Sequence, residues 1–412
     1  MTARAEADMR SAIRSLGLVA APRWRAALST KAVTGLEAWL PLNDREILAR
    51  LNVFASQKDG IAQVMTLREE AMKSLGSSQQ TSMGAENKAA LQKIDTILKH
   101  WLGGVFCAAS IDTKRVTWST STGETLEKVA DRDMVLQKVR SIQQLKRRLD
   151  HGRRCVAIFH IGMPSDPLAF VHVALMRELA RSLKFLSANA SEDEPPTHAM
   201  FYSVNSLHDA LSGLDMAARV IKCAALEVKK EFPSIHTFST LSPIPRFVKW
   251  LGAAAAGKAS EGLDIPMRHR QSLATATSQP ADCNQQILLQ QLHTLIASGD
   301  WVRQPALEHL LREPLTWLVT HYLVNEKSRG GQPLDPVARF HLRNGSMVHR
   351  VNWMGNESTA GMQESAGFMV NYLYEFEKRE DRIVSFARTG AFDVSPRVLE
   401  LLKASPPSRF VI

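Results

Sequence analysis

The sequence predicts an α+β protein in which an N-terminal all-helical bundle is followed by a larger mixed α/β domain with a helical insertion. Apolar residues near the N-terminus repeat at helical spacing, short β-branched and aromatic runs begin after Cys107, and a second helical pattern interrupts those runs. At 412 residues, the chain is long enough to bury two hydrophobic cores. We therefore expect a helical domain at residues 1–107 and a mixed domain at residues 108–412.

The helical prediction for the N-terminal domain depends on two patterns. Apolar side chains recur on one face of a helix at Leu91, Ile94, Leu98, Trp101 and Leu102. Asn43 and Asp44 form a start signal for an earlier helix. A helical bundle is the simplest arrangement that buries these faces.

The second domain is predicted from short apolar runs. Residues 155–159 and 168–175 are expected to form a buried hairpin, joined by a proline-containing turn at residues 163–167. A strand at 199–204, an amphipathic helix at 214–228 and a strand at 237–241 follow. Three strands, a helix and a further strand are the order found in the GNAT-type acyl-CoA fold. The helical insertion covers residues 282–322, and strand character returns at 340–342 and 347–353.

Composition restricts the functional classes. The chain has 51 basic and 41 acidic residues, a formal charge of +10, which favours an anionic partner. Four well-separated cysteines without a CxxC pair exclude zinc-finger spacing and favour a reducing compartment. No apolar run approaches the roughly 20 residues that span a bilayer, and residues 408–412 do not form the Ser-Lys-Leu peroxisomal signal. A cytoplasmic enzyme of bacterial type is expected, without membrane or nucleic-acid partners.

Ser242 is the first candidate for chemistry. It precedes Pro243, which disfavours the α region for the serine and holds it extended, and Pro245 stiffens the following peptides. A rigid strand end that presents one hydroxyl can position a substrate. From these residues alone, an ordinary Ser-Pro turn is the alternative.

His341 is the second candidate. Its neighbours Phe340 and Leu342 predict a strand in which the imidazole points to the opposite face. An unperturbed pKa of about 6.5 allows an imidazole to take up and release a proton near neutrality. The residues alone leave open a purely structural histidine, because imidazoles are often partly buried in ordinary cores.

Three segments together resemble the malonyl-CoA decarboxylase family. They are Phe238-Ser239-Thr240-Leu241-Ser242-Pro243-Ile244-Pro245, Asp335-Pro336-Val337-Ala338-Arg339-Phe340-His341-Leu342-Arg343-Asn344-Gly345, and Asn371-Tyr372-Leu373-Tyr374. The resemblance extends over most of the chain that follows the helical domain. It implies a GNAT-like catalytic domain that converts malonyl-CoA to acetyl-CoA and CO2, a reaction of fatty acid metabolism.

The resemblance also implies residue roles. The substrate thioester accepts the electron pair of the broken carbon–carbon bond, so no cofactor and no metal are expected. Ser242 would orient the carboxylate and could accept a proton, and His341 would protonate the new carbanion. Tyr374 aligns with a family tyrosine that lies near this pair, although an amphipathic residue at the rim is an equal alternative.

The substrate's CoA group is assigned to a second segment. In GNAT-type folds the pyrophosphate lies on free amides at the start of the central helix. Here that start is Ser212, Gly213, Leu214, Asp215, Met216, Ala217 and Ala218, with helix capping as the alternative. The family commonly has a second glycine near Ala217, and Asn344 is a further expected substrate contact.

Two other functional classes remain. An acyl-CoA-dependent acyltransferase would use the same fold and pocket, and would require an acceptor. A basic helical scaffold would bind nucleic acid in a salt-sensitive manner, but the sequence has no recognised groove-reading motif. For the decarboxylase, the resemblance implies a homotetramer assembled through the N-terminal helical domain.

Overall fold

The computed structural model describes residues 35–55, 57, 59–76, 85–102, 106–111, 116–120, 125–126, 152–160, 163–187, 194–258 and 263–403. Contacts between residues divide the chain into two compact units. The first comprises residues 1–173 and 203–231, and the second comprises residues 174–202 and 232–412. The strands β5 (Met163–Met176) and β6 (His198–Ser206) contribute residues to both units.

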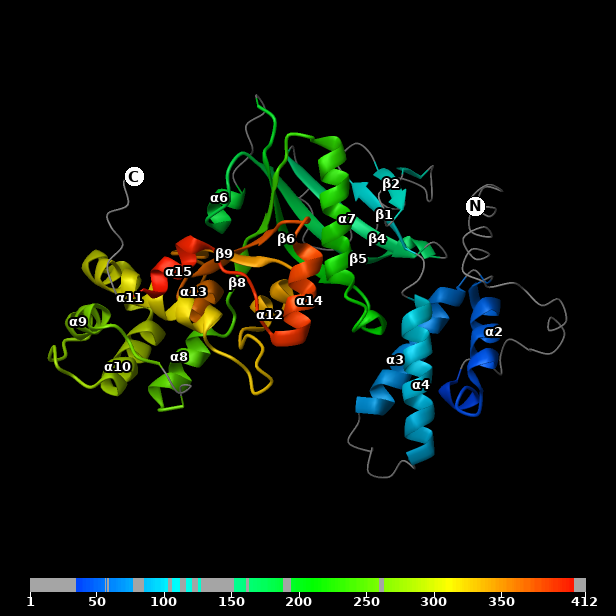
Figure 1. Cartoon of the computed structure of the whole chain (residues 1–412), viewed down its shortest axis with the longest axis horizontal. Helices are drawn as coiled ribbons and strands as arrows, with labels where there is room; N and C mark the ends of the chain where they lie inside the picture. Colours follow the sequence, from blue (N-terminus) through cyan, green and yellow to red (C-terminus); the bar gives the residue numbers. More distant parts are fainter. Residues whose placement is uncertain are drawn as a thin grey trace. The chain divides into compact units, whose positions relative to one another are not determined.

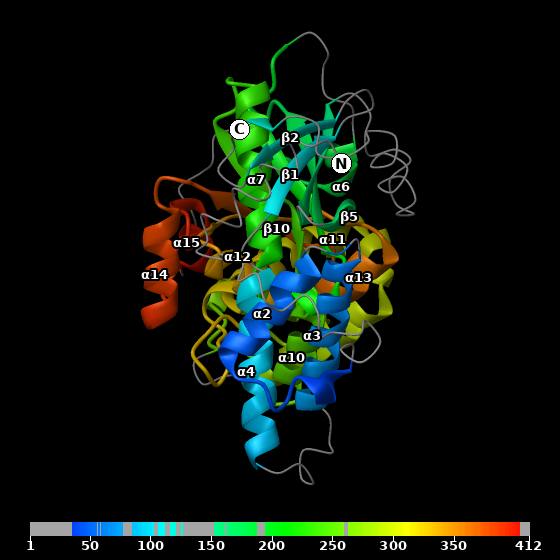
Figure 2. The same ribbon diagram turned by 90° about the vertical axis from the view of Figure 1, so that its right-hand side faces the viewer.

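The first unit begins with helices. After the short η1 (Leu36–Ala38), α2 (Asp44–Ala55) packs against α3 (Gly60–Gly76), and α3 packs against α4 (Ala85–Leu102), as Figures 1 and 2 show. Asn43 and Glu46 cap α2 reciprocally, because each backbone amide donates to the other side chain. The predicted helical face is buried at Leu91, Ile94, Leu98 and Leu102.

The first unit also holds an antiparallel set of strands. β1 (Phe106–Ile111) lies between β2 (Val116–Thr120) and β4 (Arg153–His160) and is antiparallel to both. The short β3 (Thr125–Leu126) extends the sheet beyond β2, and β5 lies beside β4. After η3 (Asp209–Leu211), the helix α7 (Met216–Glu231) packs on β1 and β4 (Figure 2).

The second unit is organised around β10 (Met369–Tyr374). β10 is antiparallel to β7 (Thr237–Thr240), β8 (Ser242–Pro243) and β9 (Met347–Asn352). β7 is also parallel to the first part of β6, with His198 opposite Thr237. The paired strands therefore bring segments from 198–201, 237–243 and 347–374 next to one another.

Helices cover these strands. The short α6 (Leu183–Ser187) comes before β6, and the helical insertion contains α8 (Phe247–Ala255), α9 (Met267–Ala276), α10 (Gln285–Ser298), η4 (Asp300–Arg303) and α11 (Pro305–Val324). α10 packs on α8 and α11 packs on α9 (Figure 1). The remaining helices are α12 (Pro336–Arg343), α13 (Thr359–Ser365), α14 (Arg379–Thr389) and α15 (Pro396–Leu402). One hydrophobic core gathers buried side chains from these helices and from β9 and β10, between Ile244 and Val398 in the sequence.

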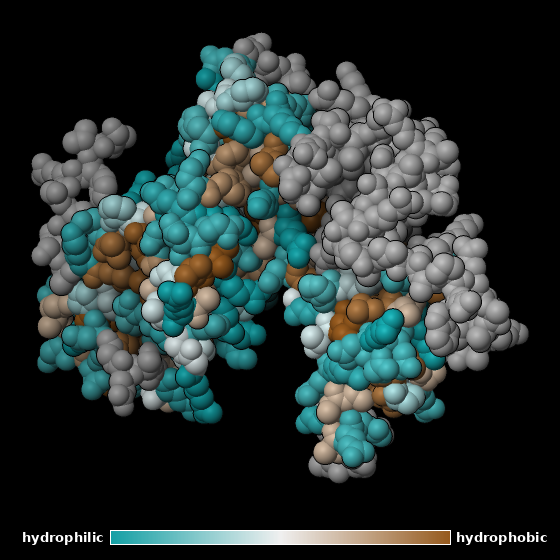
Figure 3. Space-filling view, turned by 45° about the vertical axis from the view of Figure 1, so that its right-hand side comes forward, coloured by the Kyte–Doolittle hydropathy of each residue, from teal (hydrophilic) through white to brown (hydrophobic). Residues whose placement is uncertain are grey.

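The predicted fold class is confirmed: N-terminal helices are followed by mixed α/β structure with a helical insertion. In the space-filling view, hydrophobic side chains gather in separate patches between hydrophilic areas (Figure 3). Among the described residues, no helix combines the length and the apolar character that a bilayer span needs. The predicted domain division at residues 107 and 108 stays a prediction.

The prediction of a strand at residues 340–342 is wrong, because these residues lie in α12. Asp335 caps this helix by accepting hydrogen bonds from the amides of Val337 and Ala338, at 3.0 and 2.8 Å. Pro336 occupies the first turn, where its missing N–H costs nothing. The buried residues Ala338, His341 and Leu342 fall at helical spacing, so His341 projects from a helix and not from a sheet.

The prediction of a turn at residues 163–167 is also wrong. β5 already begins at Met163 and includes Pro164 and Pro167. Proline fixes φ at about −65°, which ends a helix but is compatible with extended backbone at a strand's first residues. Pro164 and Pro167 are therefore compatible with the beginning of a strand and do not require a turn.

Candidate active site

The extended segment after β7 presents two hydroxyl groups. Thr240 ends β7 and Ser242 begins β8, and alternation along an extended chain places their side chains on one face. Ser242 Oγ donates a hydrogen bond of 2.9 Å to Thr240 Oγ1. Thr240 Oγ1 also accepts from the amide of Tyr372 on β10 at 3.3 Å. Ser242 is 5% exposed, so it is not a serine of a solvent-exposed turn.

Helix α12 brings His341 to this serine from 99 residues away in the chain. His341 Nε2 lies 3.0 Å from Ser242 Oγ, within hydrogen-bonding distance. Because α12 begins at the buried Asp335, whose side chain accepts two backbone hydrogen bonds, the helix geometry fixes the position of His341 about 1.7 turns later. Tyr322 also donates a 3.3 Å hydrogen bond to Asp335 Oδ2.

Strand β10 completes the surroundings of the imidazole with two tyrosines. The Tyr374 hydroxyl lies 2.9 Å from His341 Nδ1. The Tyr372 ring stacks on the imidazole, with centroids 4.5 Å apart and an interplanar angle of 24°. Tyr372 and Tyr374 alternate along the strand, so they share one face. His341 is thus contacted on both nitrogens and on one ring face.

Burial makes this group of side chains electrically neutral. Desolvation lowers the pKa of His341 to about 3 and raises the pKa of the Tyr374 hydroxyl above its usual range. Near neutral pH the imidazole is uncharged and has one N–H. Ser242 donates to Thr240, so Ser242 Oγ can accept from Nε2–H, and Tyr374 then donates to Nδ1. The hydrogen bonds form one consistent chain from Tyr374 to Thr240.

An asparagine network fixes the strand that carries Thr240. Asn371 Nδ2 donates to the carbonyls of Thr240 and Ala180, at 2.7 and 3.0 Å. Asn371 Oδ1 accepts from Asn352 Nδ2 at 2.8 Å and from Arg350 Nε at 3.1 Å. The Asn371 side chain thus makes four hydrogen bonds within the protein. They connect β10 to β7 and β9 next to Ser242.

Asn344 directly follows α12, three residues after His341. Its amide N–H bonds the His341 carbonyl at 3.1 Å. Its side chain is 5% exposed, and its Nδ2 has no hydrogen-bond partner among the described residues. A buried donor without a partner costs roughly 1–3 kcal/mol, and a substrate oxygen could satisfy it.

The residues expected to bind the CoA pyrophosphate lie in the first unit. Met216, Ala217 and Ala218 form the first turn of α7, and the segment before them is left-handed at Gly213 and Asp215. The amide of Ala218 already donates to the Asp215 carbonyl at 2.9 Å. The first amides of a helix have no acceptor within the helix. The backbone amides of Met216 and Ala217 could therefore donate hydrogen bonds to a phosphate.

A buried arginine supports this segment. Arg68 on α3 is 2% exposed and pairs with Asp95 at 2.9 Å. Its guanidinium also donates to the carbonyls of Ala210 and Ser212, the latter at 2.9 Å. Phosphate binding by residues 212–218 stays a prediction.

Three contributors to the site were not identified from the sequence. Thr240 and Tyr372 each lie two residues from a predicted site residue, and the period of two along a strand was the signal that could have found them. Asp335 followed by Pro336 is a helix start signal that could have placed His341 on a helix. Among the described residues, no group of three or more histidine, cysteine or acidic side chains could hold a metal ion.

Residues 110–411 match the family model described as "Malonyl-CoA decarboxylase C-terminal domain". The mitochondrial malonyl-CoA decarboxylases of Anser anser anser and Rattus norvegicus are each 33% identical to this chain, over 319 and 320 residues. These matches cover 76% of this chain in both cases, and 62% and 63% of the respective relatives. The chain thus spans less than two thirds of the length of these curated relatives.

A solved structure gives the same family. The crystal structure of malonyl-CoA decarboxylase from Cupriavidus metallidurans superposes with a TM-score of 0.60 and 26% identity, covering 86% of this chain and 82% of that one. The match to the family model includes the segments that carry Ser242, His341 and Tyr374. By sequence and by fold, this chain belongs to the malonyl-CoA decarboxylase family.

Proposed function

We propose that this chain decarboxylates malonyl-CoA to acetyl-CoA and CO2, with Ser242 and His341 at the reacting centre. The observation that carries the proposal is the buried hydrogen-bonded chain of Tyr374, His341 and Ser242 in a member of this family. A serine next to an imidazole that is itself held by a third group is typical of positioned acid–base chemistry.

The reaction makes limited chemical demands. When the bond between the methylene carbon and the carboxylate breaks, its electron pair moves into the thioester carbonyl and CO2 leaves. The protein must orient the carboxylate, keep water away, stabilise the enolate oxygen and supply one proton to carbon. The thioester itself is the electron sink, so the proposal includes no cofactor and no metal.

Ser242 is assigned to the carboxylate. Its hydroxyl is buried and fixed by Thr240 and His341 at 2.9 and 3.0 Å, so its direction is set before substrate binds. A hydroxyl that exchanges its Thr240 contact for the substrate can hold the carboxylate out of the thioester plane. This orientation aligns the breaking bond with the carbonyl π system.

His341 is assigned to the proton. The empty site favours the neutral imidazole, because burial lowers its pKa to about 3. A substrate carboxylate beside Nε2 would raise that pKa, since an opposite charge favours the charged form. His341 then takes up one proton with the substrate and gives it to the enolate carbon after CO2 leaves. The proton count matches the reaction, which consumes one proton for each malonyl group.

Asn344 is assigned to the thioester oxygen. Its Nδ2 is a buried donor without a partner among the described residues. A hydrogen bond that strengthens as the carbonyl becomes an enolate stabilises the transition state more than the ground state. We expect Asn344→Ala to lower kcat more than it changes KM.

A coupled assay for acetyl-CoA tests this function on the wild type and on Ser242→Ala. The wild type should form acetyl-CoA and CO2 from malonyl-CoA without any acceptor, and Ser242→Ala should be slower by about 10²-fold or more. Turnover that depends on an acceptor would instead indicate an acyltransferase. Equal turnover of the two proteins would refute the role of Ser242.

We propose that the functional protein is a homotetramer that assembles through the N-terminal helices. The support for this assembly is the resemblance to the family, and the apolar side chains of Leu48 and Val53 are exposed on α2. Sedimentation velocity on the full chain should give the mass of four copies. A monomer at every concentration would contradict the assembly.

A further inference from the structure

The second unit contains a cavity that the proposed decarboxylation does not use. Its volume is about 880 Å³, and its lining includes residues of β9, β10 and the 389–399 segment. Leu373 and Glu375 line the cavity, whereas Tyr372 and Tyr374 contact His341. Side chains alternate along a strand, so the cavity and the catalytic histidine lie on opposite faces of β10.

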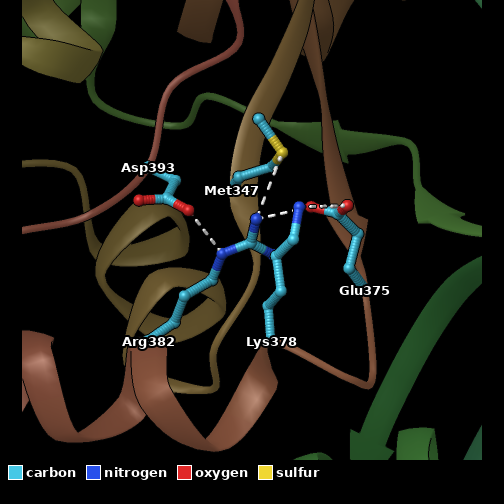
Figure 4. Close-up of polar contacts among 5 residues, drawn as sticks. All are labelled: Met347, Glu375, Lys378, Arg382 and Asp393. Carbon is cyan, nitrogen blue, oxygen red and sulfur yellow. Dashed lines mark hydrogen bonds and ion pairs between the residues drawn. The ribbon is translucent and has the colours of Figure 1, made fainter.

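The acidic side chains of the cavity are already neutralised. Arg382 is 8% exposed and lies between Asp393 and Glu375, as Figure 4 shows. Its Nε donates to Asp393 at 2.7 Å, and its Nη2 donates to Glu375 at 2.5 Å. Lys378 donates to the second oxygen of Glu375 at 3.0 Å. Neither carboxylate lacks a cation, so a cationic ligand would find no free partner here.

The basic side chains of the cavity have a hydrogen-bond donor and a positive charge without a partner among the described residues. The Nη1 atom of Arg382 is buried and has no hydrogen-bond partner among the described residues. Lys327 lines the same cavity, and its ammonium lies 4.1 Å from the centroid of the Phe392 ring. No carboxylate of the described residues lies within ion-pair distance of Lys327. With three cations and two carboxylates, the cavity carries one uncompensated positive charge.

Apolar surface surrounds these donors. Leu373, Phe392, Val394 and Leu399 line the cavity, and Leu399 is 45% exposed. A mainly apolar hollow with a few converging polar groups is typical of small-molecule sites, and its volume falls in their usual range. A charged group alone would leave this apolar lining in contact with water.

We propose that this cavity is a second ligand site, which binds an organic carboxylate with an aliphatic body. The carboxylate would lie at the ammonium of Lys327 with Arg382 in the same lining, and the aliphatic body would cover Leu373 and Phe392. Glu375 and Leu373 flank Tyr374 in the chain, so a ligand here touches the strand that holds the hydroxyl partner of His341.

Calorimetric titration of the full chain with octanoate tests the proposal, with octanol and octylamine as probes of the same length. Octanoate should bind saturably, and both other probes should bind at least about tenfold more weakly, because the charge-assisted contacts are lost or reversed. Lys327→Met should weaken octanoate binding by about tenfold. The matched control Lys184→Met, on α6 and outside the cavity lining, should leave octanoate binding unchanged.

Ser242→Ala distinguishes this cavity from the catalytic site. It should bind octanoate with wild-type affinity, since Ser242 is not part of the lining. The proposal is overturned by absent octanoate binding, by equal binding to Lys327→Met and wild type, or by weakened binding to Ser242→Ala. The titration contains no malonyl-CoA, so its outcome is independent of the proposed decarboxylation.

Discussion

At the residue scale, His341 is held on both ring nitrogens by groups that differ in kind. The Ser242 hydroxyl contacts Nε2, and its hydrogen can rotate between acceptors. The Tyr374 phenol contacts Nδ1 and stays protonated, because burial raises its pKa. A partner on one nitrogen decides which tautomer the other nitrogen presents. Tyr374 therefore acts as a positioning residue for the imidazole in the proposed mechanism.

Tyr374→Phe and Tyr372→Phe form a matched pair of tests. Tyr374→Phe removes the hydrogen bond to Nδ1, and we expect kcat to fall about tenfold or more with a shifted pH profile and a nearly unchanged KM. Tyr372→Phe keeps the stacked ring and removes a buried hydroxyl that has no partner among the described residues. It should keep activity near that of the wild type. Equal losses in the two variants would contradict this assignment.

Thr240 is expected to set the direction of the serine hydroxyl. Thr240→Val removes the acceptor at 2.9 Å and lets Ser242 turn its hydrogen toward Nε2, which selects the opposite imidazole tautomer. Steady-state kinetics should show kcat reduced by about tenfold, and Thr240→Ser should restore most of it. If Thr240→Ser is as slow as Thr240→Val, the methyl group and not the hydroxyl is important.

At the element scale, the elements with clear local patterns were predictable and the element carrying the histidine was not. The strands near 155–159, 199–204 and 347–353 follow from short apolar and aromatic runs, and the helix near 214–228 follows from apolar residues spaced three and four apart. α12 has only eight residues, so its apolar residues could be read with a period of two or of 3.6. The capping chemistry of Asp335 and Pro336 decides between them.

Asp335 is predicted to stabilise α12 mainly as its cap. Asp335→Ala removes two hydrogen bonds to backbone amides and leaves the Tyr322 hydroxyl without its acceptor. Urea denaturation should show a loss of roughly 1–3 kcal/mol in the free energy of unfolding. Asp335→Asn keeps a side-chain oxygen for the amides and should lose less. Equal destabilisation would show that the charge, and not the cap, is what matters.

At the scale of the whole molecule, the pairing of Ser242 with His341 could not be predicted from local patterns. The two residues are 99 positions apart and meet only because β8 and α12 belong to the same compact unit. The resemblance to the family predicted these two residues, and the tertiary structure places them within hydrogen-bonding distance of each other. The unpartnered side-chain amide of Asn344 and the cavity beside β10 also depend on tertiary packing. Residue spacing in the sequence therefore could not predict them.

Buried neutral histidines should make the stability of the chain fall in mild acid. Burial lowers the pKa of His160 and His269 to about 4 and that of His341 to about 3. In the unfolded chain these imidazoles titrate near pH 6.5. Between pH 6.5 and the lowered pKa values of the folded state, the unfolded state binds more protons, so falling pH favours unfolding. The folded state is therefore most stable above pH of about 6.5 with respect to these groups.

Urea denaturation at pH 7 and pH 5 checks this linkage. For His341 alone, the free energy of unfolding should drop by roughly 2 kcal/mol between the two pH values. His341→Asn removes that group, so its stability should depend less on pH by about this amount. An identical pH dependence in both proteins would mean that His341 is not buried in its neutral form.

Release of CO2 from carboxyl-labelled malonyl-CoA, measured for the wild type and His341→Asn together with acetyl-CoA affinity, tests the central claim most directly. The account predicts that His341→Asn releases CO2 about 10²–10⁴-fold more slowly, while the dissociation constant of acetyl-CoA changes little. Unchanged release by His341→Asn, or no release by the wild type, would contradict it.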